Sequence, residues 1–267
     1  MTPRRERARP KVLLLAGLSA ALLAPVAARP AAPRHLSVAA AASVRPALEE
    51  IARAFEADRP GVEVAISTGA SGALFAQIRN GAPFDLFLSA DREYPREVVE
   101  AGLAAAADER VYAFGRLVAW LPAGSTLDLE RRGLAALAGP EVRRIAIANP
   151  AVAPFGRATE RALEAAGVLA AVRGKLVLGA SVGQAAQFAT TGAADVAFLP
   201  LSLAAGEGSP LAGGRIVPVP EPLYPRIEQS GVVLARAREP ALARELLSFA
   251  TGPKGREILL RHGHGLP

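Results

Sequence analysis

The segment 69–91 constrains the fold of this chain more than any other, because a serine-bearing turn stands in it between regular patterns. Gly69-Ala-Ser71-Gly opens a stretch with helical spacing, and the apolar run before Asp91 is typical of a buried strand. With the strand pattern 62–67 in front, the order is strand, turn, helix, strand. Such a turn holds a hydroxyl and unpaired backbone N–H groups at the positive end of a helix, where anions bind. The alternative is that Ser71 only caps its own helix.

A second turn of the same kind precedes it. Leu36 to Ala42 has the pattern of a strand of small residues, and Ser43 stands where the N-cap of the following helix is expected. Pro46 falls in the first turn of that helix, where its missing N–H costs little, and Pro60-Gly61 ends the helix. Two successive strand-to-helix turns therefore carry a serine.

Strand and helix patterns alternate from residue 36 to residue 200, which favours an α/β fold with mostly parallel sheets. Residues 111–121 look like one longer strand, and the proline-rich segment 218–225 is extended and precedes the strand 231–235. These two places are candidate crossings between lobes, the first near residue 114. At 267 residues and 51% hydrophobic, the chain is long enough for one large domain or two lobes.

The first residues have the pattern of a secretory signal peptide, 1–28. Five basic residues precede an apolar run, 12–23, and Val26-Ala-Ala28 offers small residues for cleavage near Ala28. A membrane anchor is the alternative, but the run is shorter than the roughly 20 apolar residues that span a bilayer. Arg4-Arg5 leaves the choice between the twin-arginine and the general secretory route open. We expect an exported, periplasmic protein.

Charge and cysteine content exclude several functions. Residues 1–28 hold five basic residues and Glu6, a net of +4, so the formal +6 of the whole chain becomes +2 after cleavage. No basic stripe with interleaved aromatic residues remains, which argues against a nucleic-acid-binding protein. The chain has no cysteine, which excludes disulfides, thiolate metal sites and cysteine nucleophiles. Its three histidines are scattered, so no direct metal site is expected.

Ala-Ala-Ala-Ser43, Gly-Ala-Ser71-Gly-Ala-Leu and the segment Asn80 to Asp91 together resemble the periplasmic molybdate-binding proteins of bacterial ABC importers. Further matches lie in 147–156, 184–192 and 223–229, and the resemblance spans 36–263. It implies a two-lobed periplasmic-binding-protein fold of type II, with a mostly parallel sheet flanked by helices in each lobe and the ligand in the cleft. The lobes would comprise 35–114 plus 226–267, and 115–225.

The resemblance also implies a function. The protein would bind molybdate or tungstate with high affinity outside the cytoplasm and deliver it to an inner-membrane ABC permease with a cytoplasmic ATPase. It would be a monomer, not an enzyme, and would need no cofactor, since the metal arrives as the centre of the oxyanion. A binding protein or sensor for another tetrahedral oxyanion, such as sulfate, is the alternative.

By the same resemblance, four groups hold the anion: the hydroxyls of Ser43 and Ser71 and the backbone N–H groups of Phe155 and Val182. Related proteins often carry tyrosine at the position of Phe155, Ala186 or Leu199, and none of the three is tyrosine here. We therefore expect one hydrogen bond fewer, at a cost of about ten- to a hundredfold in affinity.

A serine hydrolase is a remote alternative, because Gly179-Ala-Ser181-Val-Gly183 fits the G-x-S-x-G pattern between a strand and a helix. The acid and histidine residues that a hydrolase would need beside Ser181 are badly placed in the sequence. Asp195 follows only 14 residues later, and His262 and His264 lie in a glycine-rich tail where fraying or capping is expected. Two arginines in the first turns of site helices, Arg45 and Arg157, are expected to face solvent.

Overall fold

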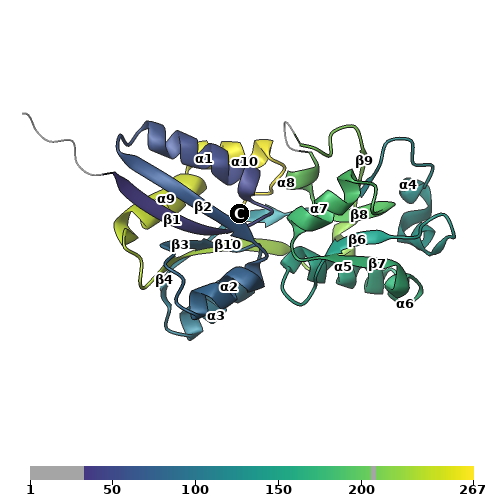
Figure 1. Ribbon diagram of the computed structural model, residues 1–267, viewed down its shortest axis with the longest axis horizontal. Helices are drawn as coiled ribbons and strands as arrows, with labels where there is room; N and C mark the ends of the chain where they lie inside the picture. The colour runs from purple at the N-terminus through teal and green to yellow at the C-terminus, as the bar shows by residue number, and fades with distance from the viewer. Residues whose placement is uncertain (1–32, 206–208) are drawn as a thin grey trace, which may run out of the picture. The chain divides into compact units, whose positions relative to one another are not determined.

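The computed structural model describes residues 33–205 and 209–267 (Figure 1). The predicted signal peptide, 1–28, and its Arg4-Arg5 pair lie outside these ranges. Within them, every helix is too short or too polar to cross a membrane.

The first sheet has five strands in the order β2-β1-β3-β10-β4. β1 pairs in parallel with β2 and β3, whereas β10 pairs antiparallel with β3 and β4, so four of the five strands run the same way. The bounds are β1 (Arg34–Ala41), β2 (Val62–Gly69), β3 (Leu86–Leu88), β4 (Ala104–Gly115) and β10 (Ile227–Leu234).

The second sheet repeats this plan in the order β7-β6-β8-β5-β9. β6 is parallel to β7 and β8, and β5 is antiparallel to β8 and β9. The bounds are β5 (Leu117–Leu121), β6 (Ile145–Ala148), β7 (Leu176–Gly179), β8 (Val196–Pro200) and β9 (Arg215–Pro218). The predicted α/β fold with two lobes and mostly parallel strands is confirmed.

Helices cover both faces of each sheet, and we call each sheet with its helices a lobe (Figure 1). In the first lobe α1, α9 and α10 pack on one face and α2 and α3 on the other. Their bounds are α1 (Arg45–Ala57), α2 (Ser71–Arg79), α3 (Glu93–Glu100), α9 (Pro240–Thr251) and α10 (Pro253–Arg261).

In the second lobe α4, α5 and α6 lie on one face, and α7 and α8 on the other. Their bounds are α4 (Leu129–Arg132), α5 (Pro154–Ala165), α6 (Leu169–Val172), α7 (Val182–Thr190) and α8 (Leu201–Ala204). Three short 3-10 helices are η1 (Gly133–Ala138), η2 (Arg173–Lys175) and η3 (Glu221–Leu223).

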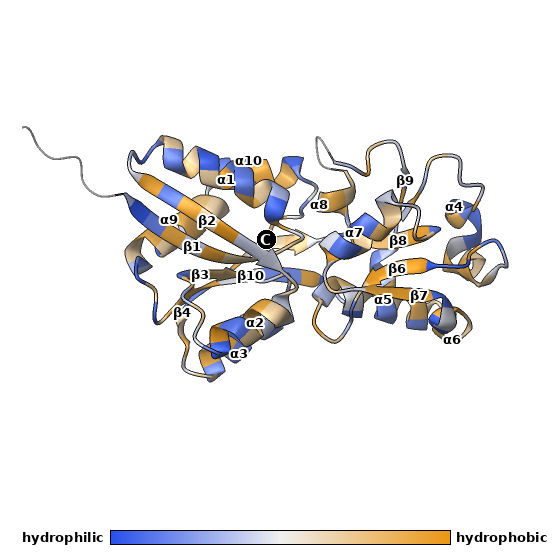
Figure 2. Cartoon of the chain, in the orientation of Figure 1, coloured by the Kyte–Doolittle hydropathy of each residue, from blue (hydrophilic) through white to orange (hydrophobic). Residues whose placement is uncertain are grey.

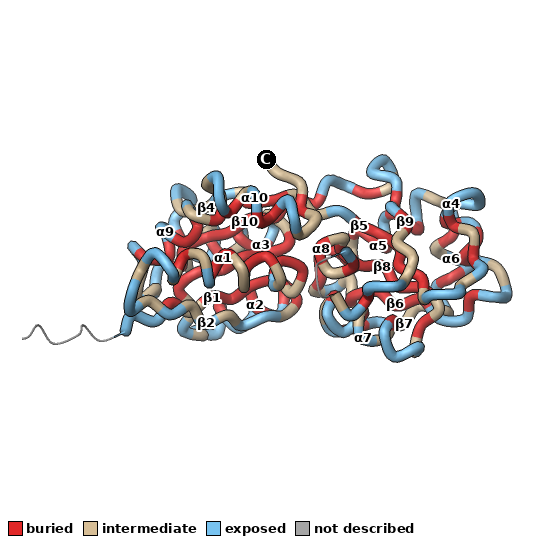
Figure 3. Tube along the Cα trace, turned by 90° about the horizontal axis from the view of Figure 1, so that it is seen from above, coloured by how far each residue is buried: buried red, intermediate tan, exposed pale blue. Residues whose placement is uncertain are grey.

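Burial on both faces explains why the strands are apolar throughout. In β1, Leu36 and Val38 join the core under α1, whereas Ala39 joins the core under α2. In β5, Leu117 and Trp120 likewise point into opposite cores. Figure 2 shows the apolar strands between helices of mixed polarity, and Figure 3 shows the buried residues gathered on the strands. The hydrophobic effect therefore holds each sheet between two layers of helices.

The chain crosses between the lobes twice. β4 ends at Gly115 in the first sheet and β5 begins at Leu117 in the second, so the predicted single strand 111–121 is two strands joined by Arg116. The return crossing lies between η3 and β10. The Tyr224 hydroxyl there accepts a hydrogen bond from the Leu117 N–H at 3.2 Å, which ties the two crossings together.

The C-terminal histidines are fixed: of the two expected roles, fraying is wrong, and capping is confirmed for His262. His262 is the C-cap of α10, and its Nε2 lies 2.9 Å from Glu50 Oε2 on α1. His264 is 2% exposed, and its backbone N–H donates to the Leu259 carbonyl at 3.0 Å. No described residue makes a hydrogen bond with its Nε2. A charge on this ring would therefore be poorly solvated.

Acid is expected to destabilise the fold through His264. Burial, and to a lesser degree the charge of His262, lowers the pKa of His264 to about 3, whereas an unfolded histidine titrates near 6.5. Between these values the unfolded chain binds more protons, so this contribution to stability is complete above pH 6.5 and is lost as the pH falls towards 3.

We expect His264→Gln to flatten the dependence of the free energy of unfolding on pH between 6.5 and 3, measured by urea denaturation. The matched control is His35→Gln, because the side chain of His35 is 61% exposed. An equal slope in His264→Gln and in the wild type would contradict the argument.

Candidate oxyanion-binding site

A small cavity lies where the strand ends of the first lobe meet the helix starts of the second. Its volume is about 10 Å³, which is close to the room that one water-sized sphere needs. It is lined by Ala41, Ala42, Ser43, Gly69, Ala70, Ser71, Ala90, Ala153, Pro154, Phe155 and Val182. All four predicted site residues are among them, and none of the lining residues is charged.

Ser71 faces this cavity and does not cap its own helix. It is the first residue of α2, and the N-cap is Ala70, which has no side-chain oxygen. The Ser71 Oγ instead accepts a hydrogen bond of 3.0 Å from the backbone N–H of Ala90, which follows β3. A hydroxyl has one proton to donate, so this contact leaves the Ser71 proton free for an acceptor in the cavity.

Ser43 has a similar arrangement, although its predicted position as N-cap is wrong. The N-cap of α1 is Val44, so Ser43 stands in the turn one residue earlier. Its Oγ accepts a hydrogen bond of 3.4 Å from Nε2 of Gln229, a fully buried residue of β10. Its carbonyl accepts from the Ser202 hydroxyl of the second lobe at 2.7 Å. The Ser43 proton therefore also remains available as a donor.

The second lobe contributes the starts of α5 and α7. Phe155 is the second residue of α5, after Pro154, which has no N–H. Val182 is the first residue of α7, whose N-cap Ser181 accepts a hydrogen bond from the Gln184 N–H at 3.4 Å. The N–H groups of Phe155 and Val182 thus belong to the unpaired first turns of two helices, where the helix dipole is positive.

The backbone N–H groups of all four predicted residues are buried without a protein acceptor. Ser43, Ser71, Phe155 and Val182 are 1%, 0%, 2% and 6% exposed. Within residues 33–205 and 209–267, no group accepts a hydrogen bond from these four N–H groups. Buried unpaired N–H groups are rare because each loses its bond to water without a replacement. With the two hydroxyls they make six donors, an arrangement suited to an acceptor-rich ligand.

The lobes touch directly beside the cavity. The Gly72 N–H of α2 donates to the Val152 carbonyl of the second lobe at 2.9 Å. A Cβ at Gly72 would lie 3.1 Å from the Val152 Cα and 2.4 Å from the Tyr94 hydroxyl. Only glycine permits this approach of the two backbones, which brings donors of both lobes around one cavity.

The positions that lack tyrosine do not face the cavity in the same way. Phe155 lines it, but the Cζ tip of its ring lies 2.6 Å from the place of a Cβ at Gly115, in the first crossing. Leu199 is fully buried in the core under α7 and α8, together with Trp120. Ala186 packs against that same core. The ring of Phe155 thus fills space at the crossing.

Ser181 does not have the partners of a hydrolase nucleophile. Its hydroxyl caps α7, as described above. The Asp195 carboxylate accepts hydrogen bonds of 2.8 Å from the N–H groups of Arg143 and Arg144, and His262 pairs with Glu50. Both of these residues are therefore engaged elsewhere, and His264 is buried with no hydrogen bond from a described residue to its Nε2.

Carboxylates near the strand ends have structural partners. Asp85 accepts hydrogen bonds from the N–H groups of Ser37, Arg238 and Glu239, and so fixes the start of α9. Across the described ranges, no cluster of three or more histidine or acidic side chains is suited to a metal ion. At the cavity the structure therefore offers a ligand hydrogen-bond donors.

Sequence reasoning missed the residues behind the serines. Ala90 and Gln229 hold the two hydroxyls, and Gly72 sets the contact between the lobes. Ala90 stands in the Ser-Ala-Asp sequence that follows β3, which was the one available signal. Gln229 lies 186 residues from Ser43 in the chain, and no local pattern connects the two.

Comparison with known proteins gives one consistent result. The family model of bacterial extracellular solute-binding proteins matches residues 36–264. The molybdate-binding protein ModA of Azotobacter vinelandii is 37% identical over 253 residues, which cover 95% of this chain and 97% of that protein. ModA of Rhodobacter capsulatus is 36% identical over 94% of this chain and 96% of that protein.

Comparison with a solved structure agrees with these sequence relatives. The periplasmic molybdate-binding protein of Azotobacter vinelandii superimposes with a TM-score of 0.81 at 34% identity, over 87% of this chain and 99% of that one. These relatives are binding proteins and not enzymes, so the hydrolase alternative is wrong. The chain belongs to the bacterial extracellular solute-binding proteins and, within them, to the group that contains the ModA proteins.

Proposed function

We propose that this protein binds molybdate, or the closely similar tungstate, in the cavity between its lobes. The observation that carries the proposal is the set of six buried donors, four N–H groups and two hydroxyls, around a cavity without a charged side chain. A tetrahedral dianion offers four acceptor oxygens, and short charge-assisted hydrogen bonds offset the hydration that it loses. The ModA relatives bind molybdate by name, which supports the same ligand here.

A site of uncharged hydrogen-bond donors also favours anions that carry no proton. Phosphate near neutral pH carries a proton that needs an acceptor, and the cavity lining offers hydroxyls already engaged as acceptors by Ala90 and Gln229. Molybdate, tungstate and sulfate carry no such proton. Molybdate and tungstate then differ from sulfate mainly in size, so a preference between them would come from the dimensions of the closed site.

Delivery to a transporter completes the proposed function. The protein would be exported by its signal peptide, act in the periplasm as a monomer, and dock on an ABC permease driven by a cytoplasmic ATPase. The lobes 35–114 plus 226–267 and 115–225 would move as units about the two crossings. Since the anion contacts donors of both lobes only when they are close, binding would shift the hinge equilibrium to the closed state.

Titration of the purified protein with molybdate, tungstate, sulfate and phosphate, followed by calorimetry, tests this proposal. We expect tight binding of molybdate and tungstate, weaker binding of sulfate and none of phosphate. Equal affinity for molybdate and sulfate would refute selection by size. Tight phosphate binding would refute the donor-only site.

Phe155→Tyr is expected not to strengthen molybdate binding, although position 155 is one of the three at which the resemblance implies a tyrosine. Its hydroxyl would extend from Cζ at the crossing, beside Gly115 and Ile227, where a Cβ on Gly115 would already be 2.6 Å from that ring. We expect the free energy of unfolding to fall by about 1–3 kcal/mol through overpacking. Calorimetric titration and urea denaturation of the variant measure both effects. A gain in affinity would mean that the hydroxyl reaches the anion.

A further inference from the structure

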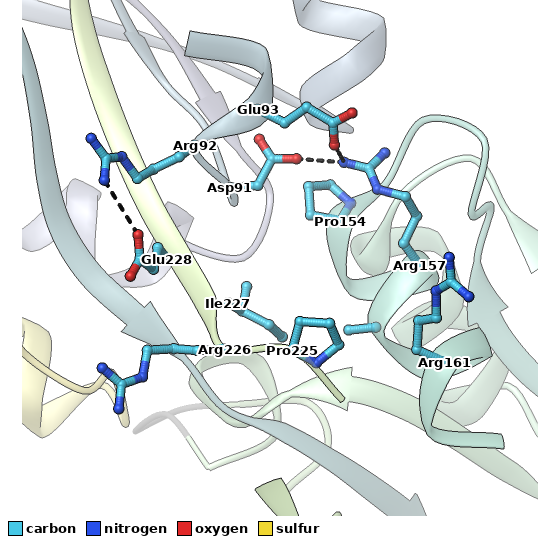
Figure 4. A pocket seen from close by; sticks show the side chains of 11 residues that line it. Asp91, Arg92, Glu93, Pro154, Arg157, Arg161, Pro225, Arg226, Ile227 and Glu228 are labelled. Atoms are coloured by element: carbon cyan, nitrogen blue, oxygen red, sulfur yellow. Dashed lines mark hydrogen bonds and ion pairs between the residues drawn. The ribbon is translucent and has the colours of Figure 1, made fainter. Parts of the chain in front are cut away.

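One cation joins the two lobes beside the cavity. Arg157 extends from α5 in the second lobe to Asp91, between β3 and α3, and to the first residues of α3 in the first lobe (Figure 4). Its Nη2 lies 2.5 Å from Asp91 Oδ2 and 3.0 Å from Glu93 Oε2, and its Nη1 donates to the Tyr94 hydroxyl at 3.2 Å. The guanidinium also lies over the Tyr94 ring, 5.2 Å from its centre. The expectation that Arg157 faces solvent is therefore wrong.

Two hydrogen bonds orient the carboxylate of Asp91 for its contact with Arg157. Its Oδ1 accepts hydrogen bonds from the Ser89 hydroxyl at 2.8 Å and from the Tyr94 N–H at 3.3 Å, which leaves Oδ2 for the guanidinium. The Asp91 side chain is 15% exposed and that of Arg157 33%. Burial raises the pKa of Asp91, against the influence of Ser89 and Arg157. Partial burial protects the pair from the screening that weakens surface ion pairs.

The ion pair stands next to the cavity. A groove of about 330 Å³ between the lobes is lined by Asp91, Glu93, Pro154 and Arg157, and Pro154 also lines the cavity. Ala90 and Phe155, the neighbours of Asp91 and Pro154 in sequence, line the cavity as well. The groove and the cavity thus meet where Arg157 contacts the first lobe.

We propose that Arg157, with Asp91 and Glu93, is a latch that keeps the lobes closed over the bound anion and sets how slowly the anion dissociates. The inference rests on the proposed function. Arg157 is a positioning residue and not a ligand, because it does not line the cavity and its charge is exceeded by the two carboxylates, which give the cluster a net −1. Such a cluster does not attract a dianion, but it links the lobes only when they are close.

Dissociation rates test the latch. Full-length protein loaded with radioactive molybdate is chased with excess unlabelled molybdate, and association is measured separately by stopped flow. We expect Arg157→Ala to release the anion about ten- to a hundredfold faster, as for loss of a charged hydrogen bond, with association changed less than about threefold. Arg157→Lys keeps the charge without the planar fork and should fall between the two. Asp91→Asn should also accelerate release.

Arg161→Ala is the matched control. Arg161 lies one turn further along α5 and lines the same groove, but its guanidinium pairs with Glu164 of the same helix at 2.9 Å. We expect wild-type release from this variant. Unchanged release from Arg157→Ala, or equal acceleration in Arg161→Ala, would overturn the latch.

A second measurement separates failure of the latch from failure of the proposed function. Wild-type protein that binds none of the oxyanions would refute the function alone. The chain has no cysteine, so spin labels at Glu100→Cys in the first lobe and Ala170→Cys in the second, both at exposed positions, would report the distance between the lobes. Arg157→Ala is expected to lengthen this distance in pulsed electron resonance. If the wild type binds no oxyanion, an unchanged distance distribution in Arg157→Ala would overturn the latch.

Discussion

Val182→Pro is expected to weaken molybdate binding by at least about a hundredfold while α7 stays intact. Proline removes one N–H donor to a charged ligand, a loss of about 1.5–3 kcal/mol, and places its ring where that N–H pointed. The first position of a helix accepts proline, and Ser181 before it is already extended, with φ −152° and ψ 171°. The same arrangement exists at Pro154, the first residue of α5. Calorimetric titration measures the affinity, and circular dichroism measures the helix content.

Val182→Ala is the control, because it keeps the N–H and shortens only the side chain. We expect it to bind molybdate within about tenfold of the wild type, since alanine removes a buried side chain but no donor. Equal affinities of the proline and alanine variants would show that the Val182 N–H does not contact the anion.

Ser71→Ala is expected to weaken molybdate binding by about ten- to a hundredfold, because one charge-assisted hydrogen bond to the anion is lost. The fold should also lose about 1–3 kcal/mol of stability, since the Ala90 N–H, which donates to Ser71 Oγ at 3.0 Å, would be buried without an acceptor. Calorimetric titration and urea denaturation measure the two effects separately.

Two further variants control for these effects. Ser181→Ala removes a hydroxyl that caps α7 outside the cavity lining, so it should cost about 1 kcal/mol of stability and leave binding unchanged. Ser71→Thr keeps the hydroxyl and should bind more tightly than Ser71→Ala. Ser71→Ala protein with wild-type affinity would remove this hydroxyl from the site.

Local sequence patterns predicted much of the fold. The strand of small residues at 36–42, the prolines at helix starts and the apolar run before Asp91 each follow from interactions within about ten residues, so the elements were predictable within a few residues. The first residues of the helices were less predictable. Ser43 and Ser71 both stand one residue from the N-cap that the structure shows, and their hydroxyls contact groups of other strands and not their own helices.

The sequence by itself determined the alternating strands and helices, the family resemblance and four of the residues that line the cavity, because these depend on the order of residues along the chain. Only the tertiary structure decided what surrounds them. The contacts of Gln229 with Ser43, of Gly72 with Val152, and of Arg157 with Asp91 join segments 66 to 186 residues or so apart. The first of these contacts forms when the first lobe folds, and the other two form only when both lobes have folded and approached, since a side chain's partner is set by packing in space and not by its neighbours in the chain.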